Sequence, residues 1–190
     1  MNFLGHLLVS GDDPLVITGN FMADAVKGRD LSAHPEGIQR GIRLHRRIDT
    51  FTDQHALTLV GRERLRAHCG KYAGVALDML YDHCIASTWD APEPLPVFAQ
   101  RMYAVLTAQA QRMPERTQRM LPYMVQGDWL SSYARIDGIA NALEGLARRV
   151  PHGSALVGAE RVFTAHREAY VAECSAFLRA LRTHLASEER

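Results

Sequence analysis

The stretch PEGIQRGIRLHRRIDTFTD, residues 35–53, decides the fold. Side chains of matching character recur in it at intervals of three and four residues, so on a helix of about 3.6 residues per turn they share one face. That face carries Ile38, Ile42, His45, Asp49 and Thr52. It begins apolar and becomes polar toward its C-terminal end. The pattern predicts a helix that starts near Pro35, lies in the core over its first half and ends in a polar cavity.

Helical periodicity continues through most of the remaining sequence, whereas the alternating pattern of a strand is hard to find. Asp13-Pro14 is a helix start signal, with Asp as the cap and Pro at the first helical position. The proline-rich segment 91–96 is interpreted as a connector. We therefore predict an all-α fold, a single-domain helical bundle over residues 1–190. Its further helices are expected over residues 2–10, 14–27, 56–69, 74–87, 95–112, 115–126, 136–149 and 158–186.

Composition narrows the class of protein. The 190 residues are 47 % hydrophobic, enough for a sizeable core, and the formal net charge is +1. This charge gives no global electrostatic argument for nucleic acid or a membrane as a partner. The three cysteines are few, odd in number and far apart, which argues against a disulfide framework or a cysteine zinc site. The N-terminal apolar run is too short for a signal peptide or a membrane span. We expect a soluble cytoplasmic protein.

The polar end of the helix over residues 35–53 has two interpretations. His45 and Asp49 lie one turn apart, so an imidazole and a carboxylate can converge on one metal ion, and Asp53 extends the row by another turn. Alternatively, His45 and Asp49 form a hydrogen bond along the helix, and the last acid is a cap. Acids near a helix C-terminus are disfavoured by the helix dipole, so they need some other stabilising partner. Both interpretations stay open.

A second polar group lies in LDMLYDHC, residues 77–84. Asp78 and Asp82 are one turn apart in an otherwise apolar helix, where carboxylates are costly to bury without a cation or a donor. A structural ion pair with the upstream arginines is the alternative. His83 follows Asp82 directly, and their directions diverge by about 100° on a helical wheel. They share a metal only if it lies between those directions.

Two further segments carry candidates. In GNFMAD, residues 19–24, Asn20 and Asp24 are one turn apart in an apolar helix, so Asp24 is a candidate metal ligand or base with Asn20 in support. An ion pair of Asp24 with an Arg or Lys is the alternative. Gly19 costs about 1 kcal/mol in a helix, which indicates close approach of another helix or a ligand. His6, in NFLGH, is by itself more typical of a satisfied core residue than of a ligand.

The candidates share one chemistry, because all are imidazoles or carboxylates on apolar helices and none is a thiolate. Such a set is typical of Mn²⁺, Fe²⁺, Mg²⁺ or a catalytic Zn²⁺ rather than of a structural zinc. The residues that could converge in this way are His6, Asp24, His45, Asp49, Asp82 and His83.

The segments NFLGH, GNFMAD, HRRIDTFTD and LDMLYDH, in this order and at these separations, resemble the acyl carrier protein phosphodiesterase family, also called holo-acyl-carrier-protein hydrolase. The similarity is specific over residues 1–89 and weaker beyond, where residues 121–149 look like the family's second half. Gly5 departs from the Ala that the family pattern leads us to expect. The family is regarded as a divergent relative of the HD-domain metal phosphohydrolases, so the resemblance implies an HD-domain-like bundle. The literal His-Asp pair is missing, and Asp82-His83 stands in reversed order.

The resemblance implies hydrolysis of the phosphodiester between 4′-phosphopantetheine and the serine of holo-acyl carrier protein, with manganese as the metal. It directs attention to five metal candidates: Asp24, His45, Asp49, Asp82 and His83. Asp24 and His45 are alternatively the base or the leaving-group acid. The second-tier candidates are His6, Asn20, Asp53 and Asp78. Lys27 or Arg46 is a candidate for contacting the phosphate.

Acyl carrier proteins are small and acidic, and enzymes usually meet them with Arg and Lys on a helix face. Arginines cluster near the candidate site, at Arg40, Arg43, Arg47, Arg62, Arg64 and Arg66. They suit bidentate contacts with carboxylates, and a local basic patch speeds encounter. The alternative is that they are ordinary solvated helix residues.

Two rival functions remain at this point. The first is an HD-like metal phosphohydrolase that acts on nucleotides, which shares the metal site but not the carrier-binding patch. The second is a non-catalytic all-α carrier-binding module, in which the polar residues form a network of ion pairs.

Overall fold

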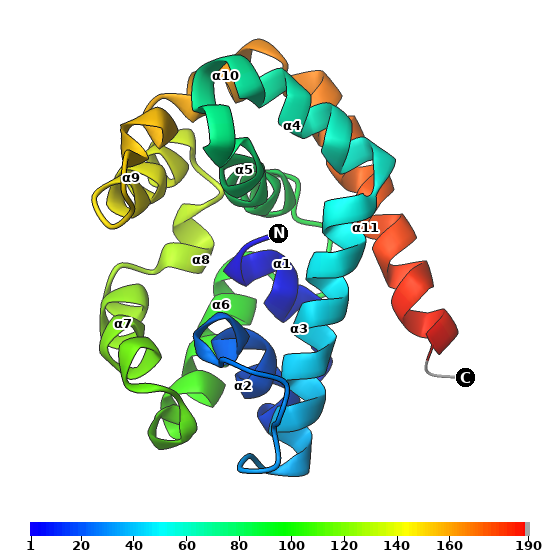
Figure 1. Cartoon of the computed structure of the whole chain (residues 1–190), viewed down its shortest axis with the longest axis vertical. Helices are drawn as coiled ribbons and strands as arrows, with labels where there is room; N and C mark the ends of the chain where they lie inside the picture. Colours follow the sequence, from blue (N-terminus) through cyan, green and yellow to red (C-terminus); the bar gives the residue numbers. More distant parts are fainter. Residues whose placement is uncertain (189–190) are drawn as a thin grey trace.

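The computed structural model describes residues 1–188, and within that range every regular element is a helix (Figure 1). The all-α prediction is therefore confirmed. In chain order the α-helices are α1 (Phe3–Leu8), α2 (Pro14–Met22), α3 (Glu36–Gln54), α4 (Ala56–Cys69), α5 (Ala73–Ser87), α6 (Leu95–Ala108), α7 (Glu115–Gln126), α8 (Trp129–Ser132), α9 (Ile136–Ala147), α10 (Ala159–Ala165) and α11 (Arg167–Glu188).

Two groups of helices face each other across the molecule. Figure 1 shows α3 as a long helix along one side, with α1 and α2 next to it, and α7, α8 and α9 in a column on the other side. Helix α1 packs against both α2 and α5. One hydrophobic core joins the elements and includes Leu4, Ile42, Leu80, Leu143 and Phe177. Of the described helices, none has the length and apolar character that crossing a membrane requires.

Helices α2 and α3 cross at two glycines. A Cβ added at Gly19 would lie 2.2 Å from the main-chain oxygen of Ile38, and one at Gly41 would lie 2.2 Å from that of Val16. Neither distance is possible for a real side chain, so only glycine permits this approach. The partner that the mid-helix glycine predicted is thus another helix. The close crossing brings the C-terminal end of α2 against the polar half of α3.

The short helix α1 is held by a carboxylate from α5. The side chain of Asp82 is fully buried and accepts hydrogen bonds from the main-chain N–H groups of Asn2, Leu4 and Gly5 over 2.7 to 3.1 Å. These donors belong to the first turn of a helix and have no partner within it. Asp82 therefore acts as a cap supplied from far along the chain, and it fixes the position of His6.

Several helices differ from the sequence prediction, and α1 and α6, for example, end at Leu8 and Ala108 rather than at residues 10 and 112. Helix α2 ends at Met22 and continues as a 3-10 turn over Ala23–Ala25, so Asp24 is not on a regular helix. The single helix expected over residues 158–186 is two helices, which meet at His166. Helix α8 was not predicted, because four residues are too few to establish a periodicity. The Asp13 cap is as predicted, since its side chain accepts from Leu15 N–H at 2.9 Å.

Candidate metal site

Two histidines and an aspartate converge where α1 and α3 meet. Nε2 of His6 lies 3.2 Å from Oδ1 of Asp49, and Nε2 of His45 lies 3.2 Å from Oδ2 of the same carboxylate. The imidazole rings are stacked with centroids 4.1 Å apart. One potential ligand atom from each of the three residues lies within 4.8 Å of the other two. These atoms are near enough to share one metal ion.

Asp24 forms the open edge of this cluster. Its Oδ1 lies 3.2 Å from Nε2 of His45, and 80 % of its side chain is exposed. The side chains of His6 and His45 are 4 % and 9 % exposed. The cluster therefore has buried imidazoles on one side and a solvent-accessible carboxylate on the other, so a substrate can reach it from one direction.

Asn20 sets the orientation of both imidazoles. Its side-chain amide donates to the main-chain oxygen of His6 at 3.0 Å and to Oγ of Ser10 at 2.8 Å, which turns Oδ1 toward the histidines. Oδ1 then lies 3.0 Å from Nδ1 of His6 and 3.1 Å from Nδ1 of His45, and the main-chain oxygen of Asn20 lies 2.8 Å from the latter. Because oxygen only accepts here, both Nδ1 atoms carry protons and both Nε2 atoms face Asp49. This is the tautomer that a metal-binding histidine needs.

The residues present fit a divalent cation. Nε2 of His6 is buried and has no hydrogen-bond partner among the described residues, although Asp49 lies 3.2 Å away. The contact has the distance of an ion pair without the geometry of a hydrogen bond. A cation would satisfy this nitrogen. Two imidazoles with one or two carboxylates are the donors of Mn²⁺, Fe²⁺ and catalytic Zn²⁺ sites.

The pKa values describe a coupled set of charges. Burial lowers the pKa of His45, but its hydrogen bonds to Asp24 and Asp49 outweigh burial and raise the pKa to about 9. Burial alone would raise the pKa of Asp49, yet its contacts with the two histidines hold that pKa below its ordinary value. Burial lowers the pKa of His6, and the hydrogen bond from His45 lowers that of Asp24. Without metal, one imidazolium thus lies between two carboxylates.

The structure places Asp82 and His83, two of the predicted metal ligands, outside the group formed by His6, His45 and Asp49. The carboxylate of Asp82 is engaged by the three N–H groups of α1. Burial raises its pKa to about 6, although the N-terminal amine and those three donors oppose the increase. Nδ1 of His83 lies 2.6 Å from the main-chain oxygen of Tyr133, and its ring packs edge-on against Phe163. Both side chains have partners in the fold away from the cluster.

Two second-tier candidates also lie apart from the cluster. Asp53 pairs with Arg62, and Asp78 pairs with the N-terminal amine of Met1 at 2.9 Å. His6 and Asn20, by contrast, move from the second tier to the centre of the site. The sequence did indicate these two residues, because His6 and Asn20 are polar side chains on apolar helices. It could not show where the six-residue helix that carries His6 packs in the fold.

Most of the predicted arginine patch is paired within the fold. Arg64 makes two contacts with Glu173 at 2.7 and 3.0 Å. Arg40 pairs with Asp13 at 2.7 Å, and Arg66 pairs with Glu63 at 2.8 Å. Arg43 donates to the side-chain oxygen of Gln39 at 2.7 Å, and Arg46, next to the patch in sequence, donates to the main-chain oxygen of Gly28 at 2.8 Å. Lys27 and Arg43 are exposed.

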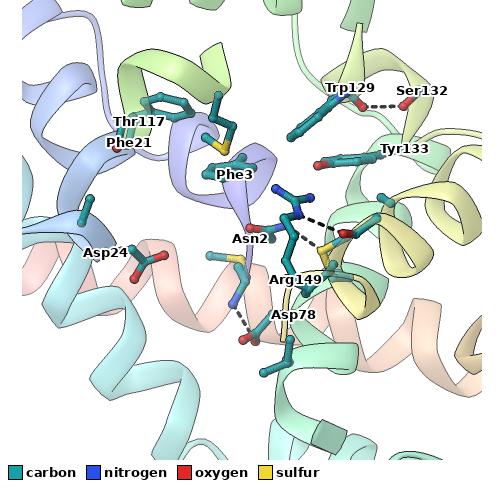
Figure 2. Close-up of a pocket in the computed structure, with 18 of the residues that line it drawn as sticks. Asn2, Phe3, Phe21, Asp24, Asp78, Thr117, Trp129, Ser132, Tyr133 and Arg149 are labelled. Atoms are coloured by element: carbon teal, nitrogen blue, oxygen red, sulfur yellow. Dashed lines mark hydrogen bonds and ion pairs between the residues drawn. The ribbon is translucent and has the colours of Figure 1, made fainter. Parts of the chain in front are cut away.

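A large cavity adjoins the cluster (Figure 2). Asp24, His45 and Asp49 line one end, and the cavity extends to α7, α8 and α9 with a volume of about 750 Å³. Figure 2 shows Phe3 and Asn2 of the N-terminal segment facing Trp129, Tyr133 and Arg149 across it. The residues on this far wall are not among the site candidates predicted from the sequence.

Fold and site together define an all-α protein with a candidate His/Asp metal site at the end of a deep cavity. The chain belongs to the acyl carrier protein phosphodiesterase family, because the family model described as "Acyl carrier protein phosphodiesterase" matches residues 1–181. The resemblance seen in the sequence motifs is thereby confirmed.

Curated relatives with the same name support this membership. The protein from Photorhabdus laumondii is 34 % identical over 161 residues, which cover 83 % of this chain and 81 % of the relative. The protein from Yersinia pestis is 35 % identical over 161 residues, with 83 % of both chains covered. The protein from Salmonella agona is 32 % identical over 172 residues, with 89 % of both covered. No solved structure matches the chain.

Proposed function

We propose that this protein is a metal-dependent phosphodiesterase that hydrolyses 4′-phosphopantetheine from the serine of holo-acyl carrier protein. The products are the apo-carrier and free 4′-phosphopantetheine. Membership of the family supports the reaction. The observation that carries the chemistry is the orientation of His6 and His45, whose Nε2 atoms both face Asp49 because Asn20 occupies their Nδ1 atoms.

In this proposal His6, His45 and Asp49 hold the cation, and manganese is the metal that we expect. When bound, a divalent cation supplies a water of lowered pKa and stabilises charge on the phosphoryl oxygens. Asp24 lies beside these donors at the open edge, and an aspartate carboxylate is ionised at neutral pH. It is therefore placed to accept a proton from the attacking water.

The bond changes follow from this placement. Water attacks phosphorus, the bond from phosphorus to the serine oxygen breaks, and the serine oxygen leaves with a proton. His45 is the alternative candidate for the donor of that proton, in place of its role as a ligand, because its Nε2 lies at the same open edge beside Asp24.

Cations around the site are candidates for contacting the substrate. Lys27 is exposed on the loop that follows Asp24, and Arg46 lies on α3 next to His45. We assign these two to the phosphate, and we assign Arg43 and Arg47 of the same helix to the acidic carrier. The assignment rests on their nearness in sequence to the cluster and on charge complementarity.

Two broader statements belong to the same proposal. The all-α fold and the His/Asp cluster support a distant relationship to HD-domain phosphohydrolases, with the donors provided by α1 and α3 instead of by the Asp82-His83 pair. The three cysteines, Cys69, Cys84 and Cys174, are free and buried, which supports a reducing cytoplasmic location.

The test is mass spectrometry of purified holo-acyl carrier protein after incubation with the protein, once with Mn²⁺ and once with EDTA. Loss of the phosphopantetheine mass with Mn²⁺ only is the expected result. No mass change in either condition would remove this substrate. Nucleotide monophosphates and cyclic dinucleotides, assayed in parallel, would then reveal the HD-like alternative, and binding of holo-carrier without turnover would favour the non-catalytic module.

A further inference from the structure

The cavity beside the cluster is much longer than a single phosphate requires. Asp24, His45 and Asp49 line only one end of its volume of about 750 Å³. That volume lies in the range of pockets that enclose an entire drug-sized ligand, about 300 to 1,000 Å³. The cavity therefore has room for a chain that is attached to the phosphate and extends away from the cluster.

The lining beyond the cluster contains a group of large apolar side chains. It includes Phe3, Met79, Met120, Trp129, Tyr133 and Leu146. Phe3 is on α1, and Figure 2 shows its ring facing Trp129 and Tyr133 on the opposite wall. Such a surface favours a ligand with apolar groups along its length, because burying them removes apolar area from water.

Polar groups are interspersed along the same walls. Ser132 and Asn141 line the cavity together with four arginines, Arg116, Arg135, Arg148 and Arg149. Figure 2 shows the side chain of Arg149 reaching into it, and the guanidinium lies 6.0 Å from the centre of the Trp129 ring. Hydroxyl, amide and guanidinium groups can donate to amide carbonyls, so the lining suits a ligand that alternates apolar segments with amides.

We propose that this part of the cavity, the arm groove, binds the pantetheine arm of the substrate while its phosphate lies at the cluster. The inference rests on the proposed function. The arm is uncharged beyond its phosphate, carries a dimethyl group and two amides, and ends in a thiol. The groove is continuous with the cluster, so the direction of the bound arm is fixed by its phosphate. With the phosphate beside Asp24, the thiol end of the arm points toward α9.

Direct binding tests the groove without turnover. The chain has two tryptophans, so in a Trp89→Phe background Trp129 is the only fluorophore of that kind. Pantetheine, which lacks the phosphate, is titrated to millimolar concentration in EDTA, with inorganic phosphate in a parallel titration. A saturable change in Trp129 fluorescence is expected with pantetheine and not with phosphate.

A filled groove provides the second test. Ala142 lines the cavity from α9 and is half-buried, so Ala142→Phe in the same background narrows the groove. The affinity for pantetheine should fall at least tenfold, and so should kcat/KM for holo-carrier. The matched control is Ala172→Phe, at an exposed alanine of α11 outside the cavity. Asn141→Phe, at an exposed lining position, replaces Ala142→Phe if the latter does not fold.

The outcomes separate the groove from the reaction. Pantetheine binding that is lost in the filled variants supports the groove even if holo-carrier is not hydrolysed. Hydrolysis of holo-carrier without any response of Trp129 to pantetheine, or with equal pantetheine affinity in filled and control variants, overturns the groove and leaves the reaction standing.

Discussion

The main-chain oxygen of Asn20 accepts a hydrogen bond of 2.8 Å from Nδ1 of His45. This bond joins α2 to α3 at the point where their close crossing ends, and it leaves the other ring nitrogen directed at Asp49. The side chain of Asn20 does the same for His6. One residue on a neighbouring helix therefore determines which nitrogen of each imidazole is available to a cation.

Asn20→Ala should weaken Mn²⁺ binding by about 10- to 100-fold, because groups that orient metal-binding histidines typically contribute that much. Isothermal titration calorimetry measures the affinity. Gln118→Ala is the matched control, since it removes a part-buried amide that donates to Met113 O at 2.8 Å in the region of α7. Unchanged affinity in Asn20→Ala would show that the histidines keep their tautomers without it.

Asp24→Ala should reduce turnover of holo-carrier by about 10²- to 10⁴-fold, the usual contribution of a positioned acid or base. The side chain is 80 % exposed, so the fold should be retained, and the melting temperature should fall only by the contribution of the hydrogen bond to His45. Asp30→Ala, at an exposed residue of the following loop, is the control and should retain activity. A large loss of stability with activity retained would instead mark Asp24 as part of a structural ion pair.

Asp82→Ala should destabilise the fold by about 3 kcal/mol or more, because two buried N–H groups and one part-buried N–H group lose their acceptor. Urea denaturation measures the change. Asp82→Asn keeps the shape and one carbonyl oxygen, so its loss should be smaller. If Asp82 were a metal ligand, the Asn variant would instead abolish Mn²⁺ binding at nearly unchanged stability.

Gly41→Ala should destabilise the protein by about 3 kcal/mol, since the added Cβ would lie 2.2 Å from the main-chain oxygen of Val16 and would force α2 and α3 apart. Metal affinity should fall with it. Gly74→Ala is the control in α5, where the nearest atom is Nε of the flexible Arg62 side chain at 3.4 Å. That change should be neutral or stabilising by up to about 1 kcal/mol.

Stability of the metal-free protein should depend on the titration of His45. Its pKa rises from 6.5 to about 9 on folding, because hydrogen bonds to Asp24 and Asp49 outweigh the opposing effect of burial. The stabilisation is therefore complete below pH 6.5 and is lost as the pH rises toward 9. In EDTA, the melting temperature of the unmodified protein should decline across this window relative to that of His45→Gln. Parallel profiles for the two proteins would contradict the assignment.

Local patterns made the fold and half of the site predictable. The spacing of Ile38, Ile42, His45 and Asp49 on one face gave both the helix and its polar end, because helical periodicity is a property of the sequence itself. Gly19 likewise indicated a close approach, which the crossing of α2 and α3 satisfies.

The remaining features depend on contacts between distant segments. A carboxylate in an apolar helix needs a partner, but the sequence could not show that Asp82 finds three main-chain donors about eighty residues upstream. It was therefore assigned to the metal. His6 was placed in the second tier because its sequence neighbours show no partner for it. Its partners in the fold, Asn20 and Asp49, come from other helices. The apolar residues on the far wall of the cavity have the same helical spacing as residues of the hydrophobic core. The sequence therefore could not distinguish them as cavity residues.

The cap that Asp82 provides has a consequence for the order in which the protein forms. His6, Asn20, Asp24, His45 and Asp49 all lie within the first 49 of the 190 residues. Yet α1 is held by a side chain that leaves the ribosome about eighty residues after it. Contacts of such long sequence separation form late, because closing the chain between them costs entropy before any contact compensates. The nascent chain thus carries every residue of the candidate metal site long before it can assemble that site.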